Sequence, residues 1–149
     1  MDAFTQFYEE NYTGVARLAL LLTQSKLAYE DLAQEAFTKV YDRFEQLERP
    51  GAYLRVTVVN LCRSWHRREG RKAAHFHLLE PLGDGVPPDV VEVLAAVAAL
   101  PYRQRAVVVL RYGEGWSEAE IARALSCRLG TVKSSAARAL GRLRSELEG

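Results

Sequence analysis

Side chains able to bind a nucleic acid gather on one predicted helix near the end of the 149-residue chain. Thr131 is suited to cap this helix, and apolar residues then recur every three or four positions, at Val132, Ala136, Leu140, Leu143 and Leu147. Another face carries donors that suit phosphate oxygens and base edges, namely Lys133, Ser134, Ser135 and Arg138. An ordinary helical hairpin with a solvated basic face is the alternative explanation of this pattern.

A shorter predicted helix precedes this one and is joined to it by a tight turn. Ser117 is suited to cap its N-terminus, and Glu120 occupies the capping-box position three residues later. The apolar face of this helix consists of Ile121, Ala122 and Leu125. Residues 126–130 interrupt the periodicity and allow a sharp change of direction. Two helices in this order, with donors on the second, predict a helix-turn-helix that reads DNA.

A second basic group lies on a helix predicted from about residue 52 to residue 68. The apolar face of this helix consists of Leu54, Val58, Leu61 and Trp65. Its other face carries Asn60, Arg63, Arg67 and Arg71, with Arg68 and Lys72 beside them. Such a row is suited to follow a phosphate backbone, because each contact releases counterions. Tyr53 and Trp65 are aromatic neighbours able to stack on unpaired bases, although the spacing of Trp65 favours a place in the core.

Charge is distributed in blocks, although the net charge of the chain is only +1. Residues 1–48 carry −5 and residues 49–79 carry +6, whereas residues 80–96 carry −4 and residues 97–149 carry +4. Two basic blocks separated by an acidic one suit a protein that contacts DNA twice. The acidic N-terminal block then faces a different partner.

The periodicity is helical almost throughout and predicts an all-α fold. Besides the helices already described, helices are expected over residues 4–22, 29–47 and 90–110, the last with a boundary at Leu100 and Pro101. Glycines and prolines make residues 70–89 an irregular connector. We therefore expect two small helical domains, residues 1–71 and 90–149, joined by a flexible linker over residues 72–89.

Composition and residue patterns favour a cytoplasmic protein that is not an enzyme. Hydrophobic residues make up 48% of the chain, which is enough for a core, and no signal peptide or membrane-spanning run is present. The two cysteines, Cys62 and Cys127, lie far apart and suggest reduced thiols. Cys62 and His66 have metal-ligand spacing, with His75 and His77 nearby, but no further ligands complete a site. We expect no metal, no cofactor, no small-molecule substrate and no membrane insertion.

Several strings resemble those of bacterial sigma factors. DLAQEAF at residues 31–37, Tyr53 with Leu54, and VVN at residues 58–60 with the arginines that follow are similar to the polymerase-binding and −10 regions. Residues 100–112 and 117–134, with GTVKS at 130–134, are similar to the −35-reading domain. The order and small size resemble the extracytoplasmic-function group of the sigma-70 family, which keeps regions 2 and 4. The resemblance covers nearly the whole chain.

The resemblance implies a protein that binds RNA polymerase core and directs promoter-specific transcription initiation. Its region 2 is a helical bundle and its region 4 a helix-turn-helix. The implied core-binding residues, which face the clamp helices of the largest subunit, are Asp31, Gln34, Glu35 and Phe37. The implied −10 contacts are Glu48, Arg49, Pro50, Gly51 and Ala52 in a base-capturing loop, and Asn60, Arg63, Arg67, Arg68 and Arg71. The implied −35 contacts are Arg128, Thr131, Lys133, Ser134, Ser135 and Arg138.

The resemblance also implies further partners, and a rival function remains as an alternative. It implies contact with the flap region of polymerase and control by an anti-sigma factor. The chain departs from the family pattern with Tyr53 where Trp is common and Ser135 where a base is common, which predicts an altered promoter preference. The alternative is a two-domain helix-turn-helix repressor or activator that acts without docking on polymerase, which is expected to bind duplex DNA unaided.

Overall fold

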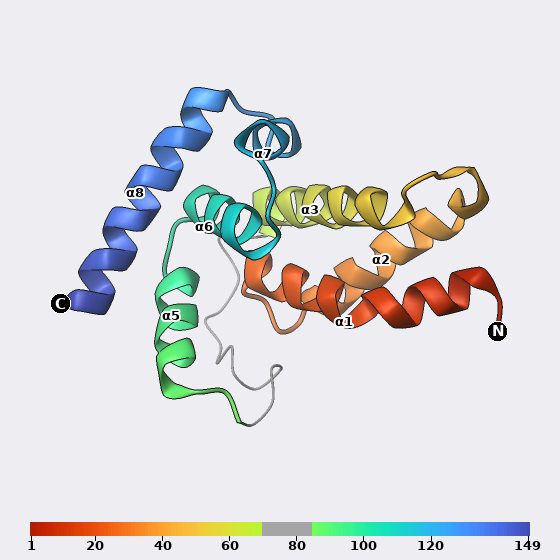
Figure 1. The fold of residues 1–149 in the computed structure, drawn as a ribbon, viewed down its shortest axis with the longest axis horizontal. Helices are drawn as coiled ribbons and strands as arrows, with labels where there is room; N and C mark the ends of the chain where they lie inside the picture. The colour runs from red at the N-terminus through yellow and green to blue at the C-terminus, as the bar shows by residue number, and fades with distance from the viewer. Residues whose placement is uncertain (70–84) are drawn as a thin grey trace. The chain divides into compact units, whose positions relative to one another are not determined.

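The computed structural model describes residues 1–69 and 85–149, and these residues form helices and turns without a strand. The chain divides into two compact helical units, one from each end of the sequence (Figure 1). The expected all-α class with two domains is confirmed. Residues 72–84 of the predicted linker lie outside the described residues, and residues 85–87 are not helical. Within the described ranges, no helix is both long enough and apolar enough to cross a membrane.

The first unit contains three long helices, α1 (Ala3–Thr23), α2 (Tyr29–Tyr41) and α3 (Pro50–Glu69), with a short 3-10 turn at Phe44–Gln46 (Figure 1). Asp2 caps α1, because its carboxylate accepts a hydrogen bond from the backbone N–H of Thr5 at 2.7 Å. Gln24 ends α1 in a left-handed conformation with φ of 54°. This start and stop lie within one residue of the predicted helix over residues 4–22.

The other two helices of this unit have different bounds from those expected. The helix predicted over residues 29–47 ends at Tyr41, and the chain turns so that Phe44 packs against Phe4 and Phe7, with ring centroids 5.3 Å apart in both pairs. Packing against α1 therefore overrides the helical periodicity of that segment. The third helix begins at Pro50, because proline suits a first helical turn.

The core of the first unit forms where all three helices pack on one another. Leu18, Leu20 and Leu22 of α1 are fully buried, as are Leu54 and Val58 of α3. Each such side chain contributes roughly 1.5–3 kcal/mol of transfer free energy on burial. The expected apolar stripe of α3 is partly wrong: its four buried positions are Leu54, Val58, Val59 and Cys62, whereas Leu61 and Trp65 are half-buried. Contact with both α1 and α2 accounts for the shift.

The second unit contains α5 (Pro88–Ala98), α6 (Tyr102–Val108), α7 (Glu118–Ala124) and α8 (Leu129–Glu148). A π-helical turn at Val109–Gly113 continues α6. The predicted boundary at Leu100 and Pro101 is confirmed. The buried Arg105 closes this junction by donating to the carbonyl of Leu100 at 2.9 Å and to that of Ala98 at 3.4 Å. Burial lowers the pKa of the Arg105 guanidinium, and these carbonyls satisfy its donors.

Helix α8 packs on α5, α6 and α7, but through a different stripe from the one expected. Its buried residues are Val132, Ser135 and Ala139, spaced i, i+3 and i+7. Leu140 and Leu147, which the sequence pattern assigns to the core, are 39% and 40% exposed. The expected stripe was partly wrong: Val132 is buried as predicted, but the buried stripe continues through Ser135 and Ala139, because close approach of the shorter helices selects small residues.

Candidate nucleic-acid interface

The helix-turn-helix in the second unit begins with the expected capping box. The backbone N–H of Glu120 donates to the Ser117 hydroxyl at 3.1 Å, and the Glu120 carboxylate accepts from the backbone N–H of Ser117 at 3.0 Å. These hydrogen bonds, the backbone one foremost, lower the pKa of Glu120. The predicted cap at Ser117 is confirmed.

The turn places the start of α8 earlier than expected. Ser126 adopts a left-handed conformation with φ of 53°, and the backbone N–H of Cys127 donates to the carbonyl of Ala122 at 3.0 Å. Arg128, not Thr131, is the N-cap residue, and its side chain makes no capping hydrogen bond. The expected cap at Thr131 was therefore wrong. A helix start without a side-chain cap leaves backbone donors for an anion such as a phosphate.

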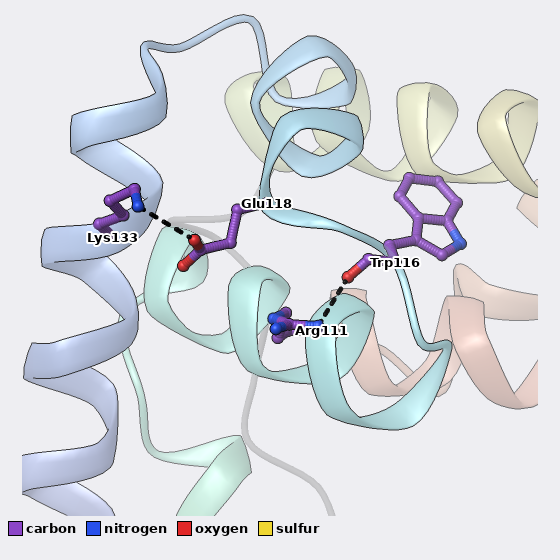
Figure 2. A network of polar contacts seen from close by, with 4 residues as sticks. All are labelled: Arg111, Trp116, Glu118 and Lys133. Atoms are coloured by element: carbon purple, nitrogen blue, oxygen red, sulfur yellow. Dashed lines mark hydrogen bonds and ion pairs between the residues drawn. The ribbon is translucent and has the colours of Figure 1, made fainter.

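An ion pair connects the two helices of the motif (Figure 2). Nζ of Lys133 lies 3.6 Å from a carboxylate oxygen of Glu118, and the two side chains are 60% and 31% exposed. A pair this exposed contributes little to stability. The guanidinium of Arg111 donates to the carbonyl of Trp116 at 3.4 Å and ties the preceding π-helical turn to the start of the motif (Figure 2).

The predicted −35 residues divide by exposure. Those that are exposed at the start of α8 or on its outer side are Arg128, Lys133, Ser134 and Arg138. Thr131 is half-buried, and its carbonyl accepts from the Ser134 hydroxyl at 3.1 Å. Ser135 is only 7% exposed and lies in the buried stripe. A hydroxyl enclosed there is not presented to DNA, so the expectation that Ser135 lies on the donor face is corrected.

Most basic residues of α3 lie toward its C-terminal end, whereas Arg55 lies nearer its start. Asn60, Arg67 and Arg68 are exposed, and Arg63 is half-buried. The guanidinium of Arg67 donates to the Ser64 hydroxyl at 3.4 Å. Positive side chains are favourable at this end because the helix dipole is negative there. Arg71 lies outside the described residues.

The predicted base-capturing loop is shorter than expected, because three of its five residues belong to α3. Glu48 and Arg49 are exposed in the loop, whereas Pro50, Gly51 and Ala52 form the first turn of the helix. Sequence reasoning missed Arg43, which lies just before the 3-10 turn that precedes this loop. Its guanidinium lies 5.2 Å from the ring centroid of Tyr53 and donates to the Tyr53 hydroxyl at 3.3 Å. A ten-residue separation with no periodic relation gave no signal for this pair.

Helix α2 has two distinct sides. Asp31, Gln34 and Glu35 are exposed on one side at i, i+3 and i+4 spacing. Phe37 lies on the other side at 2% exposed, with its ring centroid 4.6 Å from that of Tyr8. The expectation that Phe37 anchors a partner is therefore corrected, because α1 already covers its ring.

Cys62 lies in a site that does not favour metal chemistry. Cys62 is fully buried in the first unit, and burial raises the pKa of its thiol to about 12. A neutral thiol is a poor metal ligand. Both cysteines are free thiols, and the described ranges hold no group of three potential metal-ligating side chains.

Comparison with known proteins assigns a family to both units. Residues 7–72 match the family described as Sigma-70 region 2, and residues 91–143 match Sigma-70, region 4. The RNA polymerase sigma-E factor of Streptomyces coelicolor is 33% identical, over 97% of this chain and 85% of that protein. The ECF RNA polymerase sigma factor SigM of Mycobacterium tuberculosis is 32% identical, over 95% of this chain and 75% of that protein.

A solved structure has the same fold. The sigma factor RpoE, in complex with the anti-sigma factor NepR from Bartonella quintana, superposes with a TM-score of 0.75 at 23% identity and covers 99% of this chain and 98% of that one. Family matches in both units, in the order expected, identify the protein class. The chain belongs to the extracytoplasmic-function group of the sigma-70 family, whose members are non-enzymatic sigma factors that direct promoter-specific transcription initiation by RNA polymerase.

Proposed function

We propose that the first unit docks on polymerase core through α2 and holds the −10 element, while the second reads the −35 element through α8. The observation that carries this proposal is the two-sided construction of these helices, since each turns one side to its core and exposes a polar side. The proposed domains are residues 1–71 and 90–149, with residues 72–89 as the linker.

The docking face consists of Asp31, Gln34 and Glu35, and its partner is the clamp-helix region of the largest polymerase subunit. Three exposed polar side chains on one helical side offer carboxylate and amide acceptors to a basic partner. The flap region of polymerase is the proposed partner of the second unit. Burial removes Phe37 from the docking face.

The −10 surface combines the loop at Glu48 and Arg49, the first turn of α3 at residues 50–52, and the polar residues Asn60, Arg63, Arg67 and Arg68, with Arg71 proposed from the sequence. Extruding a base costs a few kcal/mol, which a shaped loop recovers on binding it. The contact of Arg43 with Tyr53 connects the segment before the 3-10 turn to the start of α3 and so spans this loop. The −35 surface consists of Arg128, Thr131, Lys133, Ser134 and Arg138, with the uncapped start of α8 facing a phosphate.

The docking proposal is tested by replacing Asp31 and Gln34 together with alanine and measuring the affinity for RNA polymerase core. We expect at least a tenfold loss, because two polar contacts are removed from a desolvated interface. The matched control replaces Gln6 and Glu10, an exposed amide and acid joined by a 3.0 Å hydrogen bond on α1. Equal affinities for both double variants would place the docking face elsewhere.

The rival function makes a different prediction. A repressor or activator that acts without polymerase is expected to bind promoter duplex in the absence of core. It should do so at the same concentrations at which the complex of this chain with core binds the duplex. In vitro transcription on a pool of genomic fragments separates the two functions, because a sigma factor starts transcription when core is added. Specific binding of the free chain without any stimulation of initiation would favour the rival.

Cellular placement and control follow from the same proposal. Docking on polymerase and promoter DNA places the chain in the cytoplasm. An anti-sigma factor is the proposed regulator, supported by the complex of the similarly folded RpoE with NepR. Such a regulator is expected to co-purify with the chain and to prevent its binding to core.

A further inference from the structure

The burial of Phe37 leaves open what supports the docking face on α2. The rings of Tyr8 and Tyr12, both on α1, cover Phe37 with centroid distances of 4.6 Å and 6.1 Å. The two tyrosines also contact each other, at 5.3 Å. Helices α1 and α2 pack side by side (Figure 1). Both tyrosines are half-buried.

One of these hydroxyls binds a residue of the docking face directly. Nε2 of Gln34 donates to the Tyr8 hydroxyl at 2.8 Å, across a separation of 26 residues in the sequence. Burial raises the pKa of Tyr12, the charges of Glu30 and Tyr8 add to this effect, and a hydrogen bond from Gln34 opposes it. The amide group of Gln34 is therefore held from α1 by the Tyr8 hydroxyl. Asp31 and Glu35 have no comparable tether from α1 among the hydrogen bonds that the structure describes.

We infer that Tyr8 is a positioning residue of the docking face, whose hydroxyl holds the Gln34 amide so that Oε1 stays available to a donor on polymerase core. An exposed glutamine loses side-chain entropy when a partner orders it, and a glutamine already held by a hydrogen bond loses less. Phe37 packs against the ring of Tyr8 and restricts its motion. The Tyr8 hydroxyl in turn restricts the exposed amide of Gln34. This inference rests on the proposed docking through α2.

The test is a double-mutant cycle on core affinity with the full chain, using Tyr8→Phe, Gln34→Ala and the two combined. Tyr8→Phe keeps the ring on Phe37 and removes only the hydroxyl. We expect it to weaken core binding by about three- to tenfold, as for loss of one hydrogen bond. In the Gln34→Ala background the same substitution should have no further effect, because a positioning residue acts through its target. Tyr41→Phe, at an exposed tyrosine on the same unit, is the matched control.

Each outcome decides a separate point. If Gln34→Ala leaves core affinity unchanged, the proposed docking through this residue fails, and the inference fails with it. If Gln34→Ala weakens binding but Tyr8→Phe does not, the docking proposal stands and the role of Tyr8 is overturned. If the two effects add, Tyr8 does not act through Gln34. Thermal melting of Tyr8→Phe within a few degrees of the parent chain excludes a general loss of structure.

Discussion

Helices α3 and α8 have the same length, but their proposed DNA-binding groups lie toward opposite ends. Each has 20 residues, one buried stripe and one basic side. Most basic residues of α3 lie toward its C-terminus, where the helix dipole favours positive side chains. Those of α8 begin at its uncapped N-terminus, where backbone donors add to the attraction for phosphate. One helical design is therefore proposed to serve two purposes: a side-chain surface for a single DNA strand toward the C-terminus of α3, and a phosphate-binding start at the N-terminus of α8.

The two helices also differ in how firmly they are held. Helix α3 packs between α1 and α2 and buries Leu54, Val58, Val59 and Cys62 completely. Helix α8 packs on shorter helices and buries two apolar residues and one serine. We therefore expect the packing of α3 to depend on large side chains and that of α8 to depend on close approach to its neighbours.

The largest expected effect is the loss of a core side chain from α3. Leu54→Ala should destabilise the first unit by about 2–5 kcal/mol, and Val132→Ala in α8 should cost about 2 kcal/mol because fewer buried methyl groups are removed. Each unit has one tryptophan, Trp65 in the first and Trp116 in the second. When one tryptophan is replaced by phenylalanine, the fluorescence of the remaining tryptophan reports the denaturation of its own unit. Equal shifts of both transitions in either variant would contradict independent units.

The next effect concerns the cap of the helix-turn-helix. Ser117→Ala should destabilise the second unit by about 1 kcal/mol, because it removes the acceptor for the backbone N–H of Glu120. The transition of the first unit, followed at Trp65, is the internal control. A loss confined to the first unit would reject the role of this capping box.

The same cap predicts a dependence on pH. Since the folded-state pKa of Glu120 is lowered, its contribution to stability is present above the usual glutamate pKa of about 4.3 and is lost as the pH falls through the folded value. Glu120→Gln keeps a capping-box acceptor and removes the titration. Denaturation of the second unit between pH 6 and about pH 3 should therefore change less in this variant than in the parent chain. An unchanged pH profile would mean that other carboxylates dominate.

A smaller effect separates the DNA contacts of the two helices. The measurement is a salt titration of the complex of this chain with core. Arg138→Ala should make the negative slope of log K against log salt shallower by about 0.9 on −35 duplex. Arg67→Ala should make it shallower by about 0.7 on a −10 single strand. Arg17→Ala and Arg103→Ala, at exposed arginines on α1 and α6, are the matched controls. A slope on duplex that changes with Arg67→Ala alone would reverse the assignment of the two helices.

The sequence predicts the all-α fold, the two units and the capping box because these depend on local rules. Ser117 and Glu120 are three residues apart, and their chemistry specifies a helix start without help from the rest of the fold. The sequence does not predict that Tyr41 ends α2 or that Phe37 is covered, because both depend on aromatic residues brought from α1 by tertiary packing. The different burial of Ser134 and Ser135 is likewise not predicted from the sequence. The two are adjacent residues of the same type, and only the side of α8 that packs on neighbouring helices decides which one is buried.

That pair of serines gives the smallest expected effect. Ser135→Ala should leave −35 affinity within about twofold and raise the stability of the second unit by at most about 0.5 kcal/mol, because alanine favours the helix and the hydroxyl is buried. Ser134→Ala, one position away on the exposed side, should weaken binding to −35 duplex by a few fold. Competition binding with the polymerase complex measures both. Equal losses in the two variants would mean that α8 rotates on its unit when it binds DNA, because a helix that buries Ser135 cannot present both hydroxyls at once.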